Sequence, residues 1–468
     1  MADEAGMAFR VAEKVAELGG RTFFVGGCVR DRLMNRPCSD IDIEVHGVTP
    51  EQLCAVLDSL GERRNTGAEF GIYGLTGCHL DIALPRREHA TGTGHRDFKV
   101  ETAPFIGPKE AAKRRDFTVN ALMEDVLTGE IVDPYGGQAD IRRGVLRHVD
   151  DQGFPEDPLR VLRGAQFAAR LEFEVAPETL SLFSGMNLAS LPRERVLCEL
   201  SKALLSAERP SRFFRVLKEA GQLESWFPEV RALVGSRQDA LFHPEGDVFV
   251  HTMQVVDAAA RLRDRASNPL GFMLSALCHD FGKPATQEII NGHIHNFGHE
   301  MAGVPLAEAF LSRLTDEAEL RRYVPNMVKL HMRPGALAFQ GAREKAFMKL
   351  FDESVCPEDL ILLAVADRQG SGTDPDVRVD TRLLEMEAAE YRRRMAMPYV
   401  TAQDLLDAGY KPGPMFREAL AYAHKLLLSG VEKKDALGQT LAFAKRWTPE
   451  SDSGHRNFEK QDISEAER

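Results

Sequence analysis

The sequence has little of what marks several common classes of protein. Its 468 residues include seven scattered cysteines and no Cys-x-x-Cys pair, so neither a disulfide framework nor a cysteine zinc site is indicated. No run approaches the about 18 uninterrupted apolar residues of a membrane span, and the N-terminus lacks a basic start followed by an apolar block. We therefore expect a cytoplasmic protein with reduced thiols and no membrane partner.

Positive charge is also in deficit. Lys and Arg total 59 against 71 Asp and Glu, a formal net charge of −12. This balance argues against nonspecific coating of nucleic acid, and we expect no DNA partner, although a local basic strip can still hold one RNA end. The 43% hydrophobic and 28% charged residues are ordinary for a folded protein. At about 150 residues per domain, the length predicts about three domains.

Two patterns divide the chain. The first third mixes strand-like runs with glycines, which predicts a small sheet flanked by helices. From about residue 157 onward, apolar residues recur at three- and four-residue spacing, which predicts helices almost throughout. The end of the chain, from Pro449, is polar and aperiodic and is expected to be disordered. The strand-like runs are 21–27, 40–48, 70–84 and 129–137.

A glycine pair and three aspartates form the first candidate site. The run TFFV leads into Gly26-Gly27 and a helix-like segment, a junction where backbone amides can approach phosphate oxygens closely. Asp40 and Asp42 stand two apart on a predicted strand, so their carboxylates share a face and repel unless a cation joins them. Asp81 adds a third carboxylate if its strand-like run lies beside the first. Convergent acids suit Mg²⁺ in two-metal phosphoryl transfer. The alternatives are a tight turn at the glycine pair, a solvated edge strand for Asp40 and Asp42, and a strand-end cap for Asp81.

A second candidate site lies in a histidine-rich window. Half of the 14 histidines fall between His243 and His331. His279 and Asp280 end an apolar helix-like run, and adjacent side chains on a helix diverge by about 100°, so both can face one metal only at a helix end or bend. The alternative is a set of histidines satisfied in the core or at the surface. The same part of the chain holds His251, Lys283, His299 and His331, and Asp367 follows it.

Four motifs in order resemble the class II tRNA nucleotidyltransferases, the family of CCA-adding enzymes and bacterial poly(A) polymerases. They are GGCVRDRLMNRPCSDIDIEV (26–45), RRDFTVNAL (114–122), IVDPYGGQADIRRGVLRHV (131–149) and EDPLRVLRGAQFAARL (156–171). The histidine-rich window resembles the HD superfamily of metal-dependent phosphohydrolases, and some class II enzymes carry such a domain. This resemblance implies that the metal ligands are His251, His279, Asp280 and Asp367, and that the further residues of the site are Lys283, His299 and His331. The resemblance covers about Phe23 to Arg446.

The resemblance implies roles for the residues of these motifs. Asp40, Asp42 and Asp81 would be catalytic, with Mg²⁺ held by the first two. Arg30 would position the triphosphate and Asp116 would contact the ribose. The implied nucleotide-binding residues are Gly27, Arg30, Arg115, Asp116, Asn120, Asp157, Arg160 and Arg163.

Asp157 and Arg160 offer a way to choose the base. They stand at i and i+3 of a predicted helix and reach one side. A carboxylate only accepts hydrogen bonds and a guanidinium only donates them, so together they match cytosine or adenine but not uracil or guanine. The alternative is that Asp157 caps a helix beginning at Pro158 while Arg160 makes a surface ion pair.

The segment before Arg115 is basic. From residue 83 to 115 it holds eight Lys and Arg against four Asp and Glu, and we interpret this glycine-dotted stretch as a mobile loop. The resemblance implies that a loop here assists the switch from CTP to ATP. Because the segment is not short, addition of C alone is disfavoured.

We predict an α+β nucleotidyltransferase head of polymerase-beta-like fold with a small mixed sheet, followed by an all-α neck, body and HD-type helical domain. The resemblance assigns the head to catalysis, the neck and body to nucleotide selection, and the C-terminal helices to tRNA binding. The predicted bounds are 1–145 for the head, 146–235 for the neck and body, 236–375 for the HD domain, 376–448 for the C-terminal helical segment and 449–468 for the tail.

The resemblance implies template-independent addition of CCA to the tRNA 3′ end from CTP and ATP, with release of pyrophosphate. It also implies an HD phosphohydrolase that repairs RNA 3′ ends, with 2′,3′-cyclic phosphodiesterase and phosphatase activities and Mg²⁺, Mn²⁺ or Ni²⁺ as its metal. The oligomeric state is left unassigned.

Four alternatives are an A-adding enzyme, a poly(A) polymerase, a nucleotide-sensing HD hydrolase and a noncatalytic RNA-binding protein. A complete HD set and the absence of a strongly basic tail argue against the polymerase. Intact Asp40 and Asp42 argue against a pure sensor, and two complete metal sets argue against a noncatalytic protein.

Overall fold

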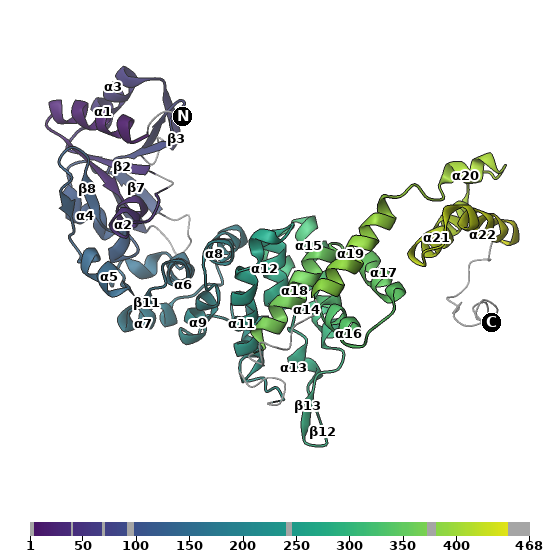
Figure 1. Ribbon diagram of the computed structural model, residues 1–468. Coiled ribbons are helices and arrows are strands. Elements are labelled where there is room, and N and C mark those ends of the chain that lie inside the picture. The colour runs from purple at the N-terminus through teal and green to yellow at the C-terminus, as the bar shows by residue number, and fades with distance from the viewer. Residues whose placement is uncertain are drawn as a thin grey trace. The chain divides into compact units, whose positions relative to one another are not determined.

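The computed structural model describes residues 4–38, 41–67, 71–90, 98–239, 246–371 and 381–447 (Figure 1). The chain divides into two compact units. The first comprises Met1–Met332 and Leu362–Val379, and the second comprises Arg333–Ile361 and Asp380–Arg468. None of the helices within the described ranges is long and apolar enough to cross a membrane.

A seven-stranded mixed sheet forms the core of the N-terminal region, which confirms the predicted fold class. Strands β2 and β5 pair in parallel, with Asp42 opposite Asp81, and the other neighbours pair antiparallel. The spatial order is β3 (Arg63–Gly67), β4 (Ile72–Leu75), β5 (Leu80–Ala83), β2 (Ile41–His46), β1 (Arg21–Val25), β8 (Met123–Asp125) and β9 (Ile131–Val132).

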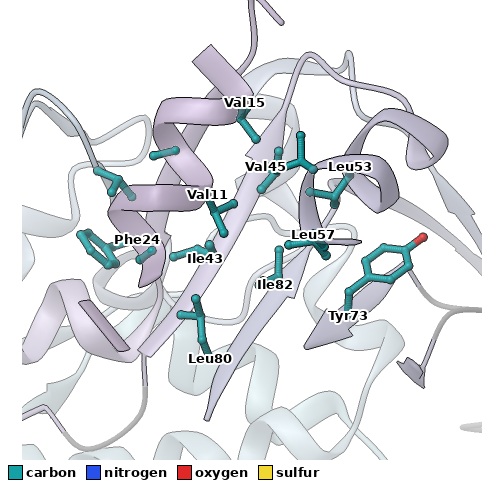
Figure 2. Close-up of a cluster of buried hydrophobic side chains, with 14 of the residues drawn as sticks. Val11, Val15, Phe24, Ile43, Val45, Leu53, Leu57, Tyr73, Leu80 and Ile82 are labelled. Atoms are coloured by element: carbon teal, nitrogen blue, oxygen red, sulfur yellow. The ribbon is translucent and has the colours of Figure 1, made fainter. Parts of the chain in front are cut away.

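Two helices cover one face of this sheet. Helices α1 (Glu4–Glu17) and α3 (Pro50–Leu60) bury Val11 and Leu53 against Ile43 and Ile82 of the strands (Figure 2). Side chains alternate along a strand, so Asp42 and Asp81, next to these core residues, lie on the opposite face. The hydrophobic core therefore determines which face carries the carboxylates.

The predicted strand-to-helix turn is present at the glycine pair. Strand β1 ends at Val25, and helix α2 runs over Gly27–Leu33. Gly26 has φ of +69°, and a Cβ there would lie 3.1 Å from Nη1 of Arg115. Glycine is thus needed both for the backbone conformation and for the close approach of this guanidinium.

The interpretation of the basic segment as a loop was wrong for the residues that the structure describes. Strands β6 (Arg86–Ala90) and β7 (Phe98–Thr102) form an antiparallel pair, and helix α4 (Gly107–Lys113) follows. The charged residues that suggested a loop alternate with Phe98 and Val100, which is a strand pattern. Residues 91–97 lie outside the described ranges.

The rest of the first unit is helical, as predicted. It contains η2 (Thr118–Asn120), α5 (Gly137–Arg143), η3 (Phe154–Glu156), α6 (Leu159–Leu171), α7 (Pro177–Gly185), α8 (Arg193–Ser206), α9 (Ser211–Glu219), α10 (Pro228–Leu233), α11 (Val248–Ala260), η4 (Arg263–Arg265), α12 (Pro269–Cys278), α13 (Lys283–Thr286), α14 (His299–Leu314) and α15 (Ala318–Leu330). One short parallel pair joins β10 (Val145–Leu146) to β11 (Glu174–Val175).

A hairpin interrupts the helices and was not predicted. Strands β12 (Glu288–Ile290) and β13 (His293–His295) extend away from α13 (Figure 1). They turn through Asn291 and Gly292, both with positive φ. Asn-Gly between two short apolar runs is a strong hairpin signal, so the sequence itself indicates this hairpin.

The second unit is entirely helical within its described residues. Leu405, Phe416, Ala419 and Ala444 form one buried cluster in it. Helix α18 (Pro357–Gly370) begins in this unit and ends in the first. The other helices are α16 (Met332–Phe339, whose first residue belongs to the first unit), α17 (Glu344–Glu353), α19 (Thr381–Ala396), α20 (Ala402–Asp407), α21 (Pro414–Leu428) and α22 (Lys433–Arg446).

Candidate functional site

Two carboxylates meet on the open face of the sheet. Asp42 and Asp81 occupy directly opposed positions of the parallel strands β2 and β5, and both are exposed. Parallel strands lie about 4.8 Å apart and in-register side chains project to the same side. The expectation that the strand of Asp81 lies beside that of Asp42 is confirmed. Asp40 lies outside the described residues.

Glu44 belongs to the same face, although the sequence analysis did not single it out. This buried carboxylate lies 3.0 Å from Nη2 of Arg114 and 3.5 Å from Nη2 of Arg115. Burial alone would raise the pKa of Glu44, but the hydrogen bond from His46 and the charges of Arg115 and Arg114 lower it to about 2. Alternation along β2 places Glu44 two residues beyond Asp42, so the strand period was the signal that could have found it.

We predict that Glu44→Gln destabilises the chain in a pH-dependent way. Because the folded pKa lies below the unfolded value, Glu44 stabilises the fold above pH about 4.5 by roughly 3 kcal/mol, and this contribution is lost as pH falls toward about 2. The difference in unfolding free energy between the two chains should therefore be largest near pH 6 and shrink below pH about 4.5. Denaturant unfolding at several pH values measures this, with the exposed Glu130→Gln as control. A gap independent of pH would contradict the assignment.

A buried polar network joins the head to helix α6. Nε of Arg163 donates to Oδ2 of Asp116 at 2.8 Å, and Nδ2 of Asn120 donates to Oδ1 of Asp116 at 3.0 Å. Nη1 of Arg30 donates to Oδ1 of Asn120 at 2.6 Å, and the guanidiniums of Arg30 and Arg163 both lie against the ring of Phe167. Four residues predicted to bind the nucleotide are thus brought together.

The electrostatics of this network keep Asp116 ionised. Burial alone would raise the pKa of Asp116, but the charge of Arg163 and the hydrogen bonds from Asn120, Arg163 and the Phe117 amide lower it overall. The Arg163 side chain is 34% exposed, so the network has one side open to solvent. Arg115 feels the acids of the sheet face and of this network. Burial lowers the pKa of Arg115, although the negative charges of Glu44, Asp116 and Asp42 act to raise it.

Asp157 and Arg160 make protein contacts at the start of α6. Oδ1 of Asp157 accepts from the Leu159 amide at 3.0 Å, but α6 begins at Leu159 with Pro158 as its N-cap, so Asp157 does not cap a helix beginning at Pro158. Oδ2 of Asp157 lies 3.2 Å from Nη2 of Arg195, a residue that the sequence analysis missed. Arg160 makes no ion pair with the residues that the structure describes; it donates to the carbonyls of Gly153 and Arg114. Each of these bonds uses one donor of five, so further donors remain for a base.

The histidine-rich residues converge in the first unit. His251 lies in α11, His279 directly follows α12, His299 begins α14, His331 directly follows α15, and Asp367 lies in α18. The expectation that the His279-Asp280 pair lies at a helix end is confirmed. Two groups could each hold a metal ion: His251 with His279 and Asp367, and Asp280 with His299 and His331.

The imidazoles are oriented for metal binding. The Nδ1 atoms of His279, His299 and His331 lie 2.8, 2.8 and 2.7 Å from the carbonyl three residues earlier. Because a carbonyl only accepts, each Nδ1 is the donor, and in the neutral form of each ring Nε2 would present a lone pair to a metal. Nε2 of His299 and Nε2 of His331 lie 3.3 Å apart, and such paired acceptors suit a shared cation.

The charge and burial of His331 and Asp280 also favour metal binding. Burial, with the charges of His279 and His299, lowers the pKa of His331 to about 3, so the imidazole is neutral and able to bind a metal. Burial would raise the pKa of Asp280, but His279 and Lys283 hold it well below its usual range. Oδ2 of Asp280 lies 3.2 Å from Nε2 of His279, and Oδ1 lies 3.4 Å from Nε2 of His299. Asp280 thus lies between the two groups.

Comparisons with known proteins agree with this architecture. Three family models match: the poly A polymerase head domain over residues 22–147, the probable RNA and SrmB-binding site of polymerase A over 172–233, and the HD domain over 248–369. The polymerase head and HD domains imply dependence on divalent metal.

Solved structures show a similar fold. The Bacillus stearothermophilus CCA-adding enzyme in complex with CTP has a TM-score of 0.64 at 22% identity, with 95% of this chain and 98% of that chain covered. The Thermotoga maritima CCA-adding enzyme complexed with tRNA_CCA has a TM-score of 0.61 at 17% identity, with 94% and 96% covered.

Curated relatives are more similar in sequence. The multifunctional CCA protein of Actinobacillus pleuropneumoniae serotype 5b is 37% identical over 363 residues, which span 74% of this chain and 85% of that protein. That of Nitrosococcus oceani is 38% identical over 339 residues, which span 70% and 80%. The chain therefore belongs to the family of multifunctional CCA proteins.

Proposed function

We propose that this chain adds CCA to the 3′ end of tRNA from CTP and ATP and releases pyrophosphate. The observation that carries the proposal is the in-register pair Asp42 and Asp81 on the open sheet face, next to the network around Asp116. Arg115 links the two, because its Nη2 lies 3.5 Å from Glu44 on the sheet face and its Nη1 donates to the carbonyl of Asn120 in the network at 3.5 Å. Membership of the multifunctional CCA protein family supports the same activity.

The acids and cations divide the work of transfer. Asp42 and Asp81, with Asp40, would hold Mg²⁺, which when bound activates the attacking 3′-hydroxyl and stabilises the leaving pyrophosphate. Arg30 and Arg163 supply positive charge for the triphosphate. The Asp116 carboxylate, held by Asn120 and Arg163, is an acceptor for ribose hydroxyls.

Base choice would rest on Asp157 and Arg160. The Asp157 carboxylate retains lone pairs beyond its bonds to Leu159 and Arg195, and it can accept from the amino group of cytosine or adenine. The remaining donors of Arg160 can reach the ring nitrogen beside that amino group. Uracil and guanine reverse the polarity, which leaves buried donors unpaired at a cost of about 1–3 kcal/mol.

We further propose that the HD site is a metal-dependent phosphohydrolase acting on blocked RNA 3′ ends, such as 2′,3′-cyclic phosphates. Its support is the two ligand groups that meet at Asp280. Four imidazoles among six ligands favour Mn²⁺ or Ni²⁺ over Mg²⁺, which prefers all-oxygen sites. When bound, the metal would supply an activated water for attack on phosphorus.

Nucleotide incorporation with three tRNA substrates tests the transferase proposal. The substrates end before CCA, at C or at CC, and each is given CTP, ATP or both with Mg²⁺ before the products are sequenced. We expect all three to mature to CCA and then stop. Growth of only the CC-ended substrate by one A would identify an A-adding enzyme, and long A tails would identify a poly(A) polymerase; either result overturns the proposal.

A further inference from the structure

One buried amide beside the HD site has donors without an acceptor. Gln238 is 7% exposed, and its Oε1 lies 2.8 Å from Nζ of Lys283. An ammonium group only donates, so the oxygen must be the amide atom that faces Lys283 and the orientation of the amide is determined. Its Nε2 then has no hydrogen-bond acceptor among the residues that the structure describes.

The surrounding backbone holds Gln238 in place. The Val248 amide donates to the Ser236 carbonyl at 2.9 Å, which ties this segment to the start of α11. On the other side, Oδ2 of Asp239 accepts from the Ile294 amide of the β12–β13 hairpin at 3.3 Å. These contacts hold the chain on both sides of Gln238, and the bond from Lys283 orients the side-chain amide, so its buried Nε2 donor favours a ligand with acceptor atoms.

Lys283 connects this amide to the metal-binding residues. Its Nζ lies 2.7 Å from Oδ2 of Asp280 and 2.8 Å from Oε1 of Gln238. The ammonium and the amide NH₂ are thus neighbouring donors at the edge of the cluster of ligands. Two donors beside a cation site suit anionic oxygens that project from one centre, as in a phosphoryl group.

We propose that Nε2 of Gln238 donates a hydrogen bond to a nonbridging oxygen of the phosphate ester bound at the HD site. This inference rests on the proposed phosphohydrolase function. In the reaction, a bond forms between the water oxygen and phosphorus, the bond from phosphorus to the ribose oxygen breaks, and that oxygen takes up the proton that the water gives up. The Gln238 amide holds the phosphoryl oxygen throughout, beside the ammonium of Lys283.

Two substitutions separate this role from a purely positioning one. Gln238→Glu retains an oxygen acceptor for Lys283 but removes the NH₂ donor, whereas the neutral Gln238→Met removes both. If Gln238 binds phosphate, both variants should bind it about tenfold to a hundredfold more weakly, as expected for a hydrogen bond to a charged group. If Gln238 only positions Lys283, the glutamate variant should bind phosphate as tightly as the unmodified chain. If only the negative charge of the new glutamate weakens binding, the methionine variant should bind phosphate as tightly as the unmodified chain.

The measurements use the full chain loaded with Mn²⁺. Calorimetry gives the affinity for inorganic phosphate, and the binding that disappears in Asp280→Ala defines the HD site. Mn²⁺ affinity and the unfolding temperature are compared in parallel, since a folding or metal defect would lower these as well. The exposed Gln287→Met is the matched control and should leave phosphate affinity unchanged.

Hydrolysis of 2′,3′-cyclic AMP distinguishes this inference from the proposed function. If the unmodified chain hydrolyses the substrate, both variants should have a kcat/KM lowered about tenfold or more. If it does not, the proposed phosphohydrolase function fails, and phosphate affinity alone decides the role of Gln238. Unchanged phosphate affinity in Gln238→Met overturns the inference in either case.

Discussion

Replacing Asp42 by asparagine is expected to lower CTP and ATP incorporation by about a thousandfold or more. Asp42 and Asp81 are exposed and directly opposed on neighbouring strands, so each carboxylate needs a cation to offset the repulsion of the other. The amide retains the size of the side chain but removes the charge that would hold Mg²⁺. Several kcal/mol of transition-state stabilisation are lost with the metal, and each 1.36 kcal/mol corresponds to about tenfold in rate.

The effect of Asp42→Asn should be confined to the transferase. Incorporation of labelled ATP into tRNA that lacks its 3′ end measures it, together with hydrolysis of 2′,3′-cyclic AMP by the same protein. Asp58→Asn is the matched control, because the Asp58 side chain is 55% exposed on α3 and pairs only with Arg63 among the described residues. Retention of more than a tenth of the transferase rate in Asp42→Asn would remove this aspartate from the metal site.

Replacing Asp280 by asparagine is expected to abolish phosphohydrolase activity and to lower metal affinity by about a hundredfold or more. One oxygen of Asp280 faces His299 of its own ligand set and the other faces His279 of the second set, so this carboxylate contacts both sets. The substitution also leaves the buried ammonium of Lys283 without its charge partner, a change that can cost about 3 kcal/mol of stability. The chain should therefore also unfold at a lower temperature.

Measurements of metal content and transferase activity separate a loss of metal binding at the HD site from a general loss of stability. Bound Mn²⁺ or Ni²⁺, measured by elemental analysis after dialysis, should fall in Asp280→Asn, whereas tRNA extension with Mg²⁺ should persist. The control is Asp264→Asn, because the Asp264 side chain is 98% exposed beside Arg263. A protein that keeps full metal content and loses only activity would assign Asp280 to catalysis rather than to metal binding.

Short-range patterns in the sequence determined much of the architecture. Strand alternation follows from the sequence alone: it places Ile43 against the core and Asp42 on the opposite face, because side chains of a strand with one buried face alternate at every residue. The divergence of adjacent side chains on a helix correctly placed His279 and Asp280 at the end of α12. The β6–β7 pair and the β12–β13 hairpin were missed because charged residues and helical neighbours obscured short strand signals.

Only the tertiary structure decided which distant groups meet. Glu44 contacts Arg114 across 70 residues of sequence, Asp157 contacts Arg195 across 38, and Gln238 contacts Lys283 across 45. No periodicity spans such separations, because strand and helix periods describe only the direction of neighbouring side chains. Whether a buried polar atom finds a partner depends on how sheet and helices pack, and that packing leaves Nε2 of Gln238 beside the metal-binding residues without an acceptor among the described residues.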